Sequence, residues 1–292
     1  MAVSTGIKYL KKNALPHQWC SGCGDGIALR VLLRAFEELD YQPNQVVVVT
    51  GIGCWGKADN YLLTSALHVT HGRALAYATG VKAANPDLHV VALMGDGDGA
   101  TIGGNHLIHS ARRNIDLTAV VVNNLNYGMT GGQQSAMTPS DRITSTTSYG
   151  NPERAFDICA LVAAAGANYV ARETIYNGLA LKNRIREALV KKGFSLVEVV
   201  SPCTTLYGPN NKMKEPTDML RWLREKGVPA AKYEKLANPE ADGYFLTGKL
   251  VDRNVPDFST RYREIQMRLQ AGSAASSPGA ASAPARAEAK QK

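Results

Sequence analysis

Apolar residues recur along the chain in two alternating patterns. Where they return every three or four residues they predict amphipathic helices, and short continuous runs rich in valine predict buried strands. Helices are expected over 24–39, 72–84, 104–113, 152–165 and 176–191, and strands over 46–50, 89–94, 117–122, 168–171 and 195–199. A regular alternation of this kind is typical of an α/β fold.

The predicted strands contain the runs VVVV, HVVALM and LTAVVV, which are apolar throughout. Continuous runs indicate strands that helices cover on both faces, as in a doubly wound, mostly parallel sheet. Ligands bind such sheets beyond the carboxyl ends of the strands. The segments that directly follow the predicted strands are therefore where chemistry is expected: GIGCWG, GDGDG, NNLNYGMTGG and SPCTT.

The sequence predicts one α/β domain over 1–206 and a C-terminal extension over 207–270 that packs on this domain or on a partner. Within the extension, KEPTDMLRWLREKG suggests a short helix, and 237–258 has the character of an extended arm. Residues 271–292 are almost all Ala, Ser, Gly and Pro before a few late charges. Such a segment buries too little apolar surface to offset its ordering entropy, so a disordered tail is expected.

Composition narrows the function classes. The chain has 292 residues, of which 45% are hydrophobic, and no run approaches the roughly 20 apolar residues of a membrane helix. Residues 1–16 lack the apolar core of a signal peptide, so a cytoplasmic location is predicted. The net charge of +8 is scattered among acidic residues, which argues against nucleic acid and suits an acidic partner or a phosphorylated ligand. Five cysteines without an export signal argue against a disulfide framework.

Oxygen-bearing side chains follow two of the predicted strands. Gly95-Asp96-Gly97-Asp98-Gly99 comes after one strand and Asn123-Asn124 after the next. Gly-Asp-Gly is also an ordinary tight turn, but a carboxylate and an amide from adjacent strand ends suit Mg²⁺ shared with substrate phosphates. The glycines let a diphosphate approach the backbone, and the next helix N-terminus favours its charge. The spacing resembles the thiamine diphosphate motif, which implies that Asp96, Asn124 and the main chain of Asn126 bind Mg²⁺.

Four cysteines, Cys20, Cys23, Cys54 and Cys203, fall in three of the predicted loops. Four thiolates suit an iron–sulfur cluster or zinc, and the single close pair favours a cluster, because structural zinc sites usually have two such pairs. A thioredoxin-like redox pair is a further alternative, since Cys20 and Cys23 precede a helix N-terminus, but it leaves the other two thiols unexplained. Cys159 lies on the apolar face of a predicted helix and is expected to be a buried small hydrophobe.

Six segments recur in a characteristic order and spacing: WCSGCGDG, GIGCWGKADN, HVTHGR, GDGDGATIGGNHLIHSARRN, NNLNYGMTGGQ and SPC. Over roughly 15–204 they resemble the β subunits of 2-oxoacid:ferredoxin oxidoreductases. The resemblance implies thiamine diphosphate, Mg²⁺ and a [4Fe–4S] cluster held by Cys20, Cys23, Cys54 and Cys203. It also implies coenzyme A as co-substrate, ferredoxin as electron acceptor, and an α subunit in an α2β2-type assembly. In the family, that α subunit supplies the glutamate that activates the aminopyrimidine and much of the substrate and coenzyme A site, so this chain alone should be inactive.

The resemblance also indicates site residues. Those expected to contact thiamine diphosphate are Ile52, Gly53, Cys54, Trp55, His71, Gly95, Asp96, Gly97, Asp98, Asn124, Gly128, Met129 and Thr130. His71, Arg73 and Thr130 are the candidate catalytic residues. Some relatives carry lysine at the position of Gly131, where it meets the substrate carboxylate; here that contact is left to Thr130, Arg73 or the α subunit, and there is room for a longer substrate. YGMTGGQ looks most like the 2-oxoglutarate type.

The expected reaction is the reversible oxidative decarboxylation of 2-oxoglutarate with coenzyme A to succinyl-CoA and CO₂. Pyruvate or branched-chain 2-oxoacids are alternative substrates for the same chemistry. A non-oxidative thiamine diphosphate decarboxylase is a rival enzyme, but it would not need four thiols. A non-catalytic electron-transfer or zinc-binding module is the second rival, but it would not need Asp96 and Asn124 at diphosphate spacing.

Overall fold

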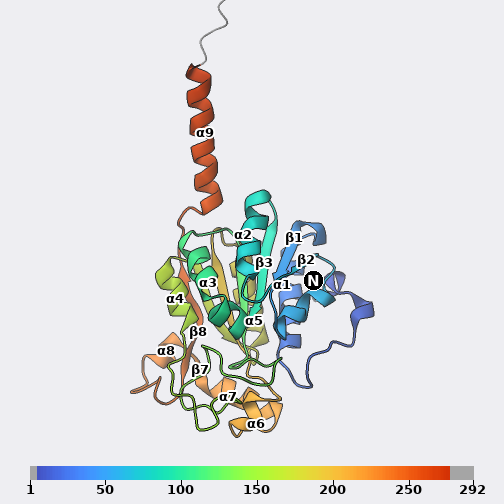
Figure 1. The fold of residues 1–292 in the computed structure, drawn as a ribbon, viewed down its shortest axis with the longest axis vertical. Coiled ribbons are helices and arrows are strands. Elements are labelled where there is room, and N and C mark those ends of the chain that lie inside the picture. The colour runs from blue at the N-terminus through green and yellow to red at the C-terminus, as the bar shows by residue number, and fades with distance from the viewer. Residues whose placement is uncertain (1–4, 277–292) are drawn as a thin grey trace, which may run out of the picture.

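A computed structural model describes residues 5–276, and an eight-stranded sheet forms its centre (Figure 1). The strand order is β2-β1-β3-β4-β6-β5-β8-β7, and every neighbouring pair is parallel except β5 and β8. The strands are β1 Val46–Thr50, β2 Ser65–His68, β3 His89–Gly95, β4 Thr118–Asn123, β5 Tyr169–Thr174, β6 Ser195–Val200, β7 Gly227–Pro229 and β8 Phe245–Asp252. The predicted doubly wound, mostly parallel sheet is confirmed.

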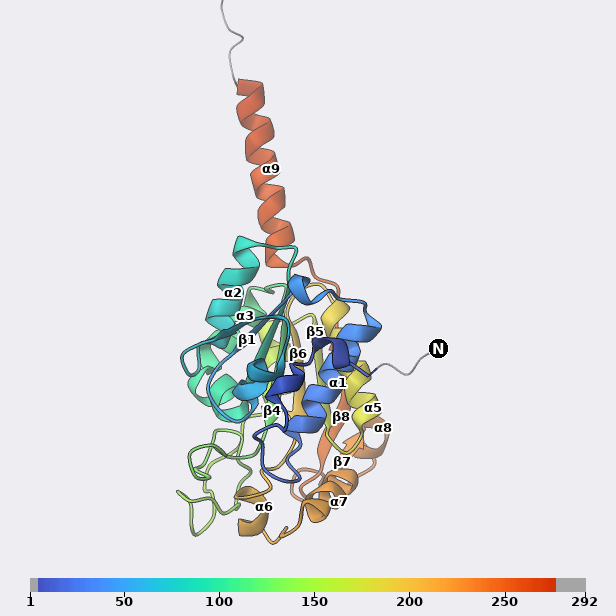
Figure 2. The same ribbon diagram turned by 90° about the vertical axis from the view of Figure 1, so that its right-hand side faces the viewer.

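Helices cover both faces of the sheet (Figures 1 and 2). Two helices, α1 (Asp25–Glu38) and α5 (Gly178–Val190), pack together on one face. The other face carries α2 (Ala74–Ala84), α3 (Gly104–Arg112) and α4 (Ile158–Ala165). Since successive strand residues point to opposite faces, a run such as β1 supplies both cores: Val46 and Val48 to the first, Val47 and Val49 to the second.

Several elements differ from expectation. The edge strand β2 was not predicted, because its sequence SALH has no apolar run and all four side chains are exposed. The predicted helix over 152–165 begins only at Ile158, since the side chain of Asp157 caps it by accepting a hydrogen bond from the Ala160 N–H. The π-helical turn Gly97–Ile102 directly after β3 was also not foreseen.

The C-terminal extension contributes to the sheet itself. Within the segment predicted as an extended arm, β8 pairs antiparallel with β5, and β7 pairs with β8. The helix expected in KEPTDMLRWLREKG is α7 (Pro216–Lys226); the short helices α6 (Tyr207–Asn210) and α8 (Ala230–Tyr233) flank it. Through these strands, this part of the chain packs on the sheet.

The last described element, α9 (Phe258–Ser276), projects away from the body (Figures 1 and 2). The tail predicted to be disordered begins within it: 271–276 continue the helix, in keeping with the high helix propensity of alanine, and 277–292 lie outside the described residues. From residue 5 to 276, no helix combines the length and apolar character needed to cross a membrane.

Candidate cofactor site

The loops that follow β1, β3, β4 and β6 meet at the carboxyl edge of the sheet, together with the start of α1. The β4 and β6 loops are joined directly: the main-chain N–H of Ser201 donates to the Asn123 carbonyl (2.9 Å), and that of Cys203 to the Asn124 carbonyl (3.0 Å). The segments in which the sequence predicts chemistry therefore lie side by side.

All four predicted ligand cysteines line one cavity of about 100 Å³. Cys20 and Cys23 form a turn in which the Cys23 N–H donates to the Cys20 carbonyl (3.1 Å). A Cβ placed on Gly128 would lie 3.5 Å from the Cys203 sulfur and 3.6 Å from the Cys54 sulfur. Because Gly128 has no side chain, the space between these two thiols stays open.

The arrangement of the thiols bears on the three alternatives left open by the sequence. Within 5–276, no three His, Cys, Asp or Glu side chains converge closely enough to hold a single metal ion. The thiols instead surround a space, which suits a multi-iron cluster better than one zinc ion. Burial raises the pKa of the Cys54 thiol to about 12 and also raises that of Cys23, with the Asp25 carboxylate adding to both. The thioredoxin-like alternative leaves Cys54 and Cys203 unexplained, although both line the same cavity as the pair.

Two tryptophans fix the loop that carries Cys54. The Trp19 indole donates to the Cys54 carbonyl (2.7 Å), and the Trp55 indole donates to the Val120 carbonyl (3.3 Å). Trp55 is fully buried in the core. Its side chain supports the loop, so any contact between Trp55 and a cofactor would come from its main chain.

Asp96, at the end of β3, is a buried carboxylate without a cationic partner. The Ser135 hydroxyl donates to its Oδ2 (2.5 Å), and the main-chain N–H of Asn124 also hydrogen-bonds to the carboxylate. Among the described side chains, no lysine, arginine or histidine lies within ion-pair distance of Asp96. Burial raises the pKa of Asp96 to about 7. A divalent cation would supply the missing positive charge.

Two asparagines of the loop after β4 have side-chain amide oxygens that accept no hydrogen bond from the described residues. Asn124 donates through Nδ2 to the Ser201 carbonyl (2.9 Å), and no donor in the described part of the chain reaches its Oδ1. The Oδ1 atom of Asn126 is buried without a hydrogen-bond partner. Between them, Leu125 adopts φ +64°, which is strained for leucine. The Leu125 N–H donates to Asn123 Oδ1 (3.1 Å) and its carbonyl accepts from Thr138 Oγ1 (2.8 Å), which hold the strained turn in place.

Asp98, predicted to contact the cofactor, also links two loops of the site. Its Oδ1 hydrogen-bonds to His71 Nδ1 (2.6 Å) and accepts from the N–H groups of Gly72 (2.6 Å) and Ile52 (3.3 Å). Asp98 thus connects the loop after β1 to the His71 loop. These contacts make Asp98 a positioning residue for His71 and Ile52 through Oδ1, whereas its Oδ2 is buried without a hydrogen-bond partner among the described residues.

The remaining predicted residues lie on the solvent side. Met129 and Thr130 are exposed in a turn closed by Tyr127 and Gln133, and the Thr130 hydroxyl donates to Gln133 Oε1 (2.7 Å). Arg73 is exposed, with its guanidinium 3.1 Å from the Gly72 carbonyl.

The predicted site glycines differ in their surroundings. A Cβ on Gly97 would collide with the Tyr127 ring, so Gly97 admits the tyrosine. A Cβ at Gly95 would approach only a carbonyl at 3.9 Å, and one at Gly53 (φ +135°) would meet nothing within 4 Å. Gly53 and Gly95 therefore leave space at the site, whereas Gly97 packs within the protein.

Sequence reasoning missed two residues of the site. Asp25, at the start of α1, is fully buried; its Oδ1 lies 3.5 Å from Asn124 Nδ2, its Oδ2 has no partner among the described residues, and burial raises its pKa to about 6. The signal was present in WCSGCGDG, where an aspartate follows the cysteine pair. Ser135 carries no sequence signal, because its contact with Asp96 depends entirely on the folded loop. Cys159 is buried as expected and belongs to the core beneath α4.

Comparisons with known proteins agree with this geometry. Residues 45–199 match the family described as thiamine pyrophosphate enzyme, C-terminal TPP binding domain. The 2-oxoglutarate synthase subunit KorB of Methanocaldococcus jannaschii is 44% identical over 264 residues, which are 90% of this chain and 98% of the relative. The same-named subunit of Archaeoglobus fulgidus is 51% identical over 217 residues, 74% of this chain and 79% of the relative.

A solved structure extends the likeness to three dimensions. The 2-oxoglutarate:ferredoxin oxidoreductase from Magnetococcus marinus, with 2-oxoglutarate, coenzyme A and succinyl-CoA bound, matches with a TM-score of 0.81 and 30% identity, covering 95% of this chain and 98% of that one. The sheet, the strand-end loops and these relatives lead to one conclusion: the chain belongs to the thiamine diphosphate-binding β subunits of the 2-oxoacid:ferredoxin oxidoreductases, the family of the KorB subunits.

Proposed function

We propose that this chain is the β subunit of a 2-oxoglutarate:ferredoxin oxidoreductase, which converts 2-oxoglutarate and coenzyme A to succinyl-CoA and CO₂ and passes the electrons to ferredoxin. The observation that carries the proposal is that one residue, Asn124, belongs both to the four-thiol cavity and to the site around Asp96. Asn124 lines the four-thiol cavity and also hydrogen-bonds through its main chain to Asp96. A decarboxylase without an electron acceptor would have no use for the first site, and an electron-transfer module would have none for the second.

The residues present fit the groups that the family uses. Asp96, the Asn124 side chain and the main chain of Asn126 would hold Mg²⁺ with the diphosphate, since Asp96 is a buried carboxylate that lacks a counter-charge. Cys20, Cys23, Cys54 and Cys203 would hold a [4Fe–4S] cluster. When bound, thiamine diphosphate supplies the electron sink for decarboxylation and the cluster a route for single electrons.

The protein's own part is to bind, orient and exclude water. Cys54, which lines the thiol cavity, directly follows Gly53, where a Cβ would meet nothing within 4 Å. Asp98 fixes the His71 ring through Nδ1 and thereby leaves Nε2 as the nitrogen available to a bound group. Arg73, two residues after His71, is exposed and supplies a positive charge suited to a carboxylate of 2-oxoglutarate.

Partners complete the site. An α subunit would supply the glutamate that activates the aminopyrimidine and much of the substrate and coenzyme A site, in an α2β2-type assembly. No glutamate of this chain lies among the residues at the strand-end edge described above. We therefore expect the chain to be inactive alone, to work in the cytoplasm with ferredoxin, and to need neither a membrane nor nucleic acid.

The test is anaerobic viologen reduction by the chain purified with its α partner, in the presence of coenzyme A. Substrates to compare are 2-oxoglutarate, pyruvate and 2-oxoisovalerate, and we expect selective reduction with the first. Selectivity for pyruvate or the branched acid would leave the chemistry standing and replace the substrate. If a preparation containing iron, sulfide and thiamine diphosphate gave no coenzyme A-dependent reduction with any of them, the proposed reaction would be wrong.

A further inference from the structure

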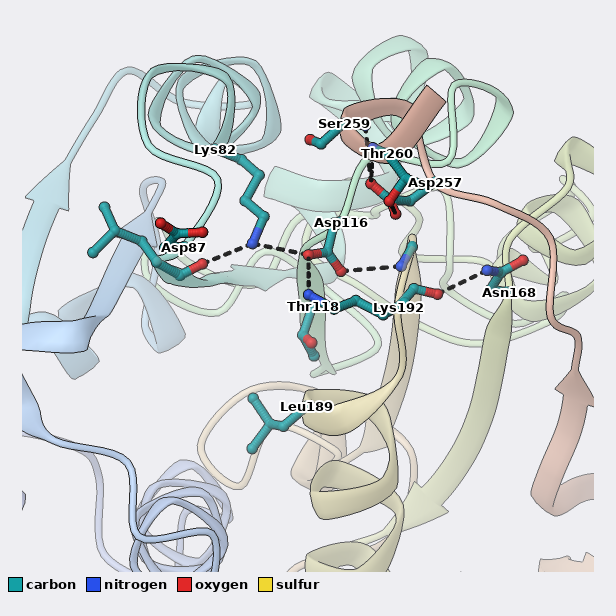
Figure 3. Close-up of polar contacts among 12 residues, drawn as sticks. Lys82, Asp87, Asp116, Thr118, Asn168, Leu189, Lys192, Asp257, Ser259 and Thr260 are labelled. Carbon is teal, nitrogen blue, oxygen red and sulfur yellow. Dashed lines mark hydrogen bonds and ion pairs between the residues drawn. The ribbon is translucent and has the colours of Figure 1, made fainter. Parts of the chain in front are cut away.

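The helix α9 leaves the body in a fixed direction because its base is anchored. Asp257 caps its first turn, accepting from the N–H groups of Ser259 (2.9 Å) and Thr260 (3.1 Å), as Figure 3 shows near the amino edge of the sheet. The side chains of Asn114 and Asn168 both donate to the Val255 carbonyl (3.1 and 2.7 Å), just before the helix. Beyond this base the helix stands clear of the sheet and its covering helices (Figure 2).

One side of α9 is apolar and uncovered. Phe258, Tyr262, Ile265 and Leu269 are spaced four, three and four residues apart, which places them along one side of a helix. All four are exposed, Tyr262 by 53% and Leu269 by 69%. We call these four residues the α9 stripe. An isolated helix is marginal in water, and a stripe of large apolar side chains is normally covered, so this side has the character of an interface.

The lower part of the α9 stripe forms one wall of a hollow of about 530 Å³ against the body. Its other walls include Val255, Pro256 and four arginines: Arg112, Arg113, Arg253 and Arg261. No carboxylate in the described part of the chain lines this hollow, and none pairs with these four guanidiniums. Apolar centres with arginine at the rim are typical of protein interfaces, and the uncompensated charge specifies the sign of the partner.

We propose that the α9 stripe and the arginine-rimmed hollow dock a segment of the enzyme's partner subunit that is apolar at its centre and acidic at its edges. A second copy of this chain fits less well, because it would bring the same arginines into opposition. The hollow lies at the amino edge of the sheet, away from the cofactor site, so this contact would join the subunits without forming part of the active site. The proposal rests on the proposed function only in requiring that a partner subunit exists.

The test measures binding of the full-length chain to the purified partner subunit, with fluorescence titration for Kd and native mass spectrometry for stoichiometry. We expect the double variant Tyr262→Ser/Ile265→Ser to weaken binding at least tenfold. Arg253→Glu/Arg261→Glu should weaken it at least tenfold at low salt and by less as salt rises, since the loss is electrostatic. The melting temperature of each chain should stay unchanged, because these side chains do not contribute to either core.

Two matched control variants change the same types of residue outside the proposed docking surface. Met267→Ser removes an equally exposed apolar side chain on the opposite side of α9, and Arg186→Glu reverses an exposed arginine on α5; both should bind like the wild type. Wild-type affinity in both double variants would overturn the proposal. So would a chain that dimerises alone and loses dimerisation in Tyr262→Ser/Ile265→Ser, because the occupant would then be a second copy. An intact complex without 2-oxoacid activity would instead contradict only the proposed function.

Discussion

The carboxylates at the two edges of the sheet differ in whether a lysine pairs with them. At the amino edge, Asp116 pairs with Lys82 (2.9 Å) and Lys192 (3.2 Å), as Figure 3 shows. Burial raises the pKa of Asp116, but the two lysines outweigh it and the pKa falls below its ordinary value. At the carboxyl edge, no cationic side chain between residues 5 and 276 pairs with Asp25 or Asp96, and burial raises their pKa values to about 6 and 7.

The negative charge of Asp116 is balanced by lysines of the chain itself, whereas that of Asp96 is left to be balanced by a bound group. Asp116 joins α2, the start of β4 and the turn before β6, so its ion pairs belong to the stability of the fold. Asp96 contributes nothing comparable, because an unpaired buried carboxylate costs free energy. Exchanging each aspartate for asparagine should therefore give opposite results.

Asp96→Asn should have the largest effect on cofactor binding. Loss of the carboxylate that we assign to Mg²⁺ should weaken thiamine diphosphate binding by more than about a hundredfold. The free energy of unfolding of the cofactor-free chain should stay equal or rise, because the uncompensated charge is gone. Isothermal titration with Mg²⁺ and urea unfolding measure the two quantities. Normal cofactor binding would show that Asp96 is not a ligand.

Cys203→Ser tests the neighbouring thiol site in the same way. The variant should lose its iron while still binding thiamine diphosphate, because the two sites share Asn124 but not their ligands. Iron and sulfide analysis with the visible absorption spectrum provides the measurement. Cys159→Ser, a cysteine in the core beneath α4, should keep its full iron content. Four irons per chain in Cys203→Ser would remove this residue from the ligand set.

Asp116→Asn should change stability instead of binding. It leaves the nearly buried Lys82 without its carboxylate, and removing one partner of such a pair costs about 3 kcal/mol. Affinity for thiamine diphosphate should match the wild type at temperatures where the variant is folded. A cofactor-binding defect at full stability would break the distinction between the two edges.

Only part of the fold and of the candidate site could be predicted from the sequence. The strands β1, β3, β4, β5 and β6 were predictable because most of their side chains are buried on both faces of the sheet. The strands β2 and β8 were not, because exposed or half-buried side chains leave no continuous apolar run. The thiols and Asp96 were predictable because their spacing along the chain resembles that of a known family. Asp25 and Ser135 were not, since their roles arise only when distant loops pack.

For Asp98, the sequence predicted the location of the residue but not the contacts of its side chain. Its position in GDGDG predicts a cofactor contact; in the fold, three contacts from two other loops converge on its Oδ1, and its Oδ2 is buried without a hydrogen-bond partner among the described residues. Spacing along the chain places a residue at the site, and only the packed structure decides whether it faces the ligand or its neighbours.

The Asp116 contribution should also depend on pH, with a sign that its pKa determines. A carboxyl whose folded pKa lies below its ordinary value of 3.8 stabilises the fold fully above that value, and the contribution is lost as the pH falls through the folded pKa. The difference in unfolding free energy between the wild type and Asp116→Asn should thus be full at pH 7 and shrink below about pH 4. Urea unfolding at pH 7, 5 and 3 measures it. A constant difference would mean that the ion pairs are not its source.

The smallest expected effect comes from adding one methyl group to the thiol cavity. In Gly128→Ala the new Cβ would lie at ordinary contact distance from the sulfurs of Cys54 and Cys203, so the cofactor-free chain should change in stability by less than about 1 kcal/mol. The same methyl group occupies space that a cluster needs, and iron content should fall several-fold. Gly80→Ala is the matched control: a Cβ at this exposed position in α2 meets nothing within 4 Å, and the exchange should stabilise the helix by about 0.5–1 kcal/mol without changing the iron content. Full iron in Gly128→Ala would mean that the cluster does not lie against this loop.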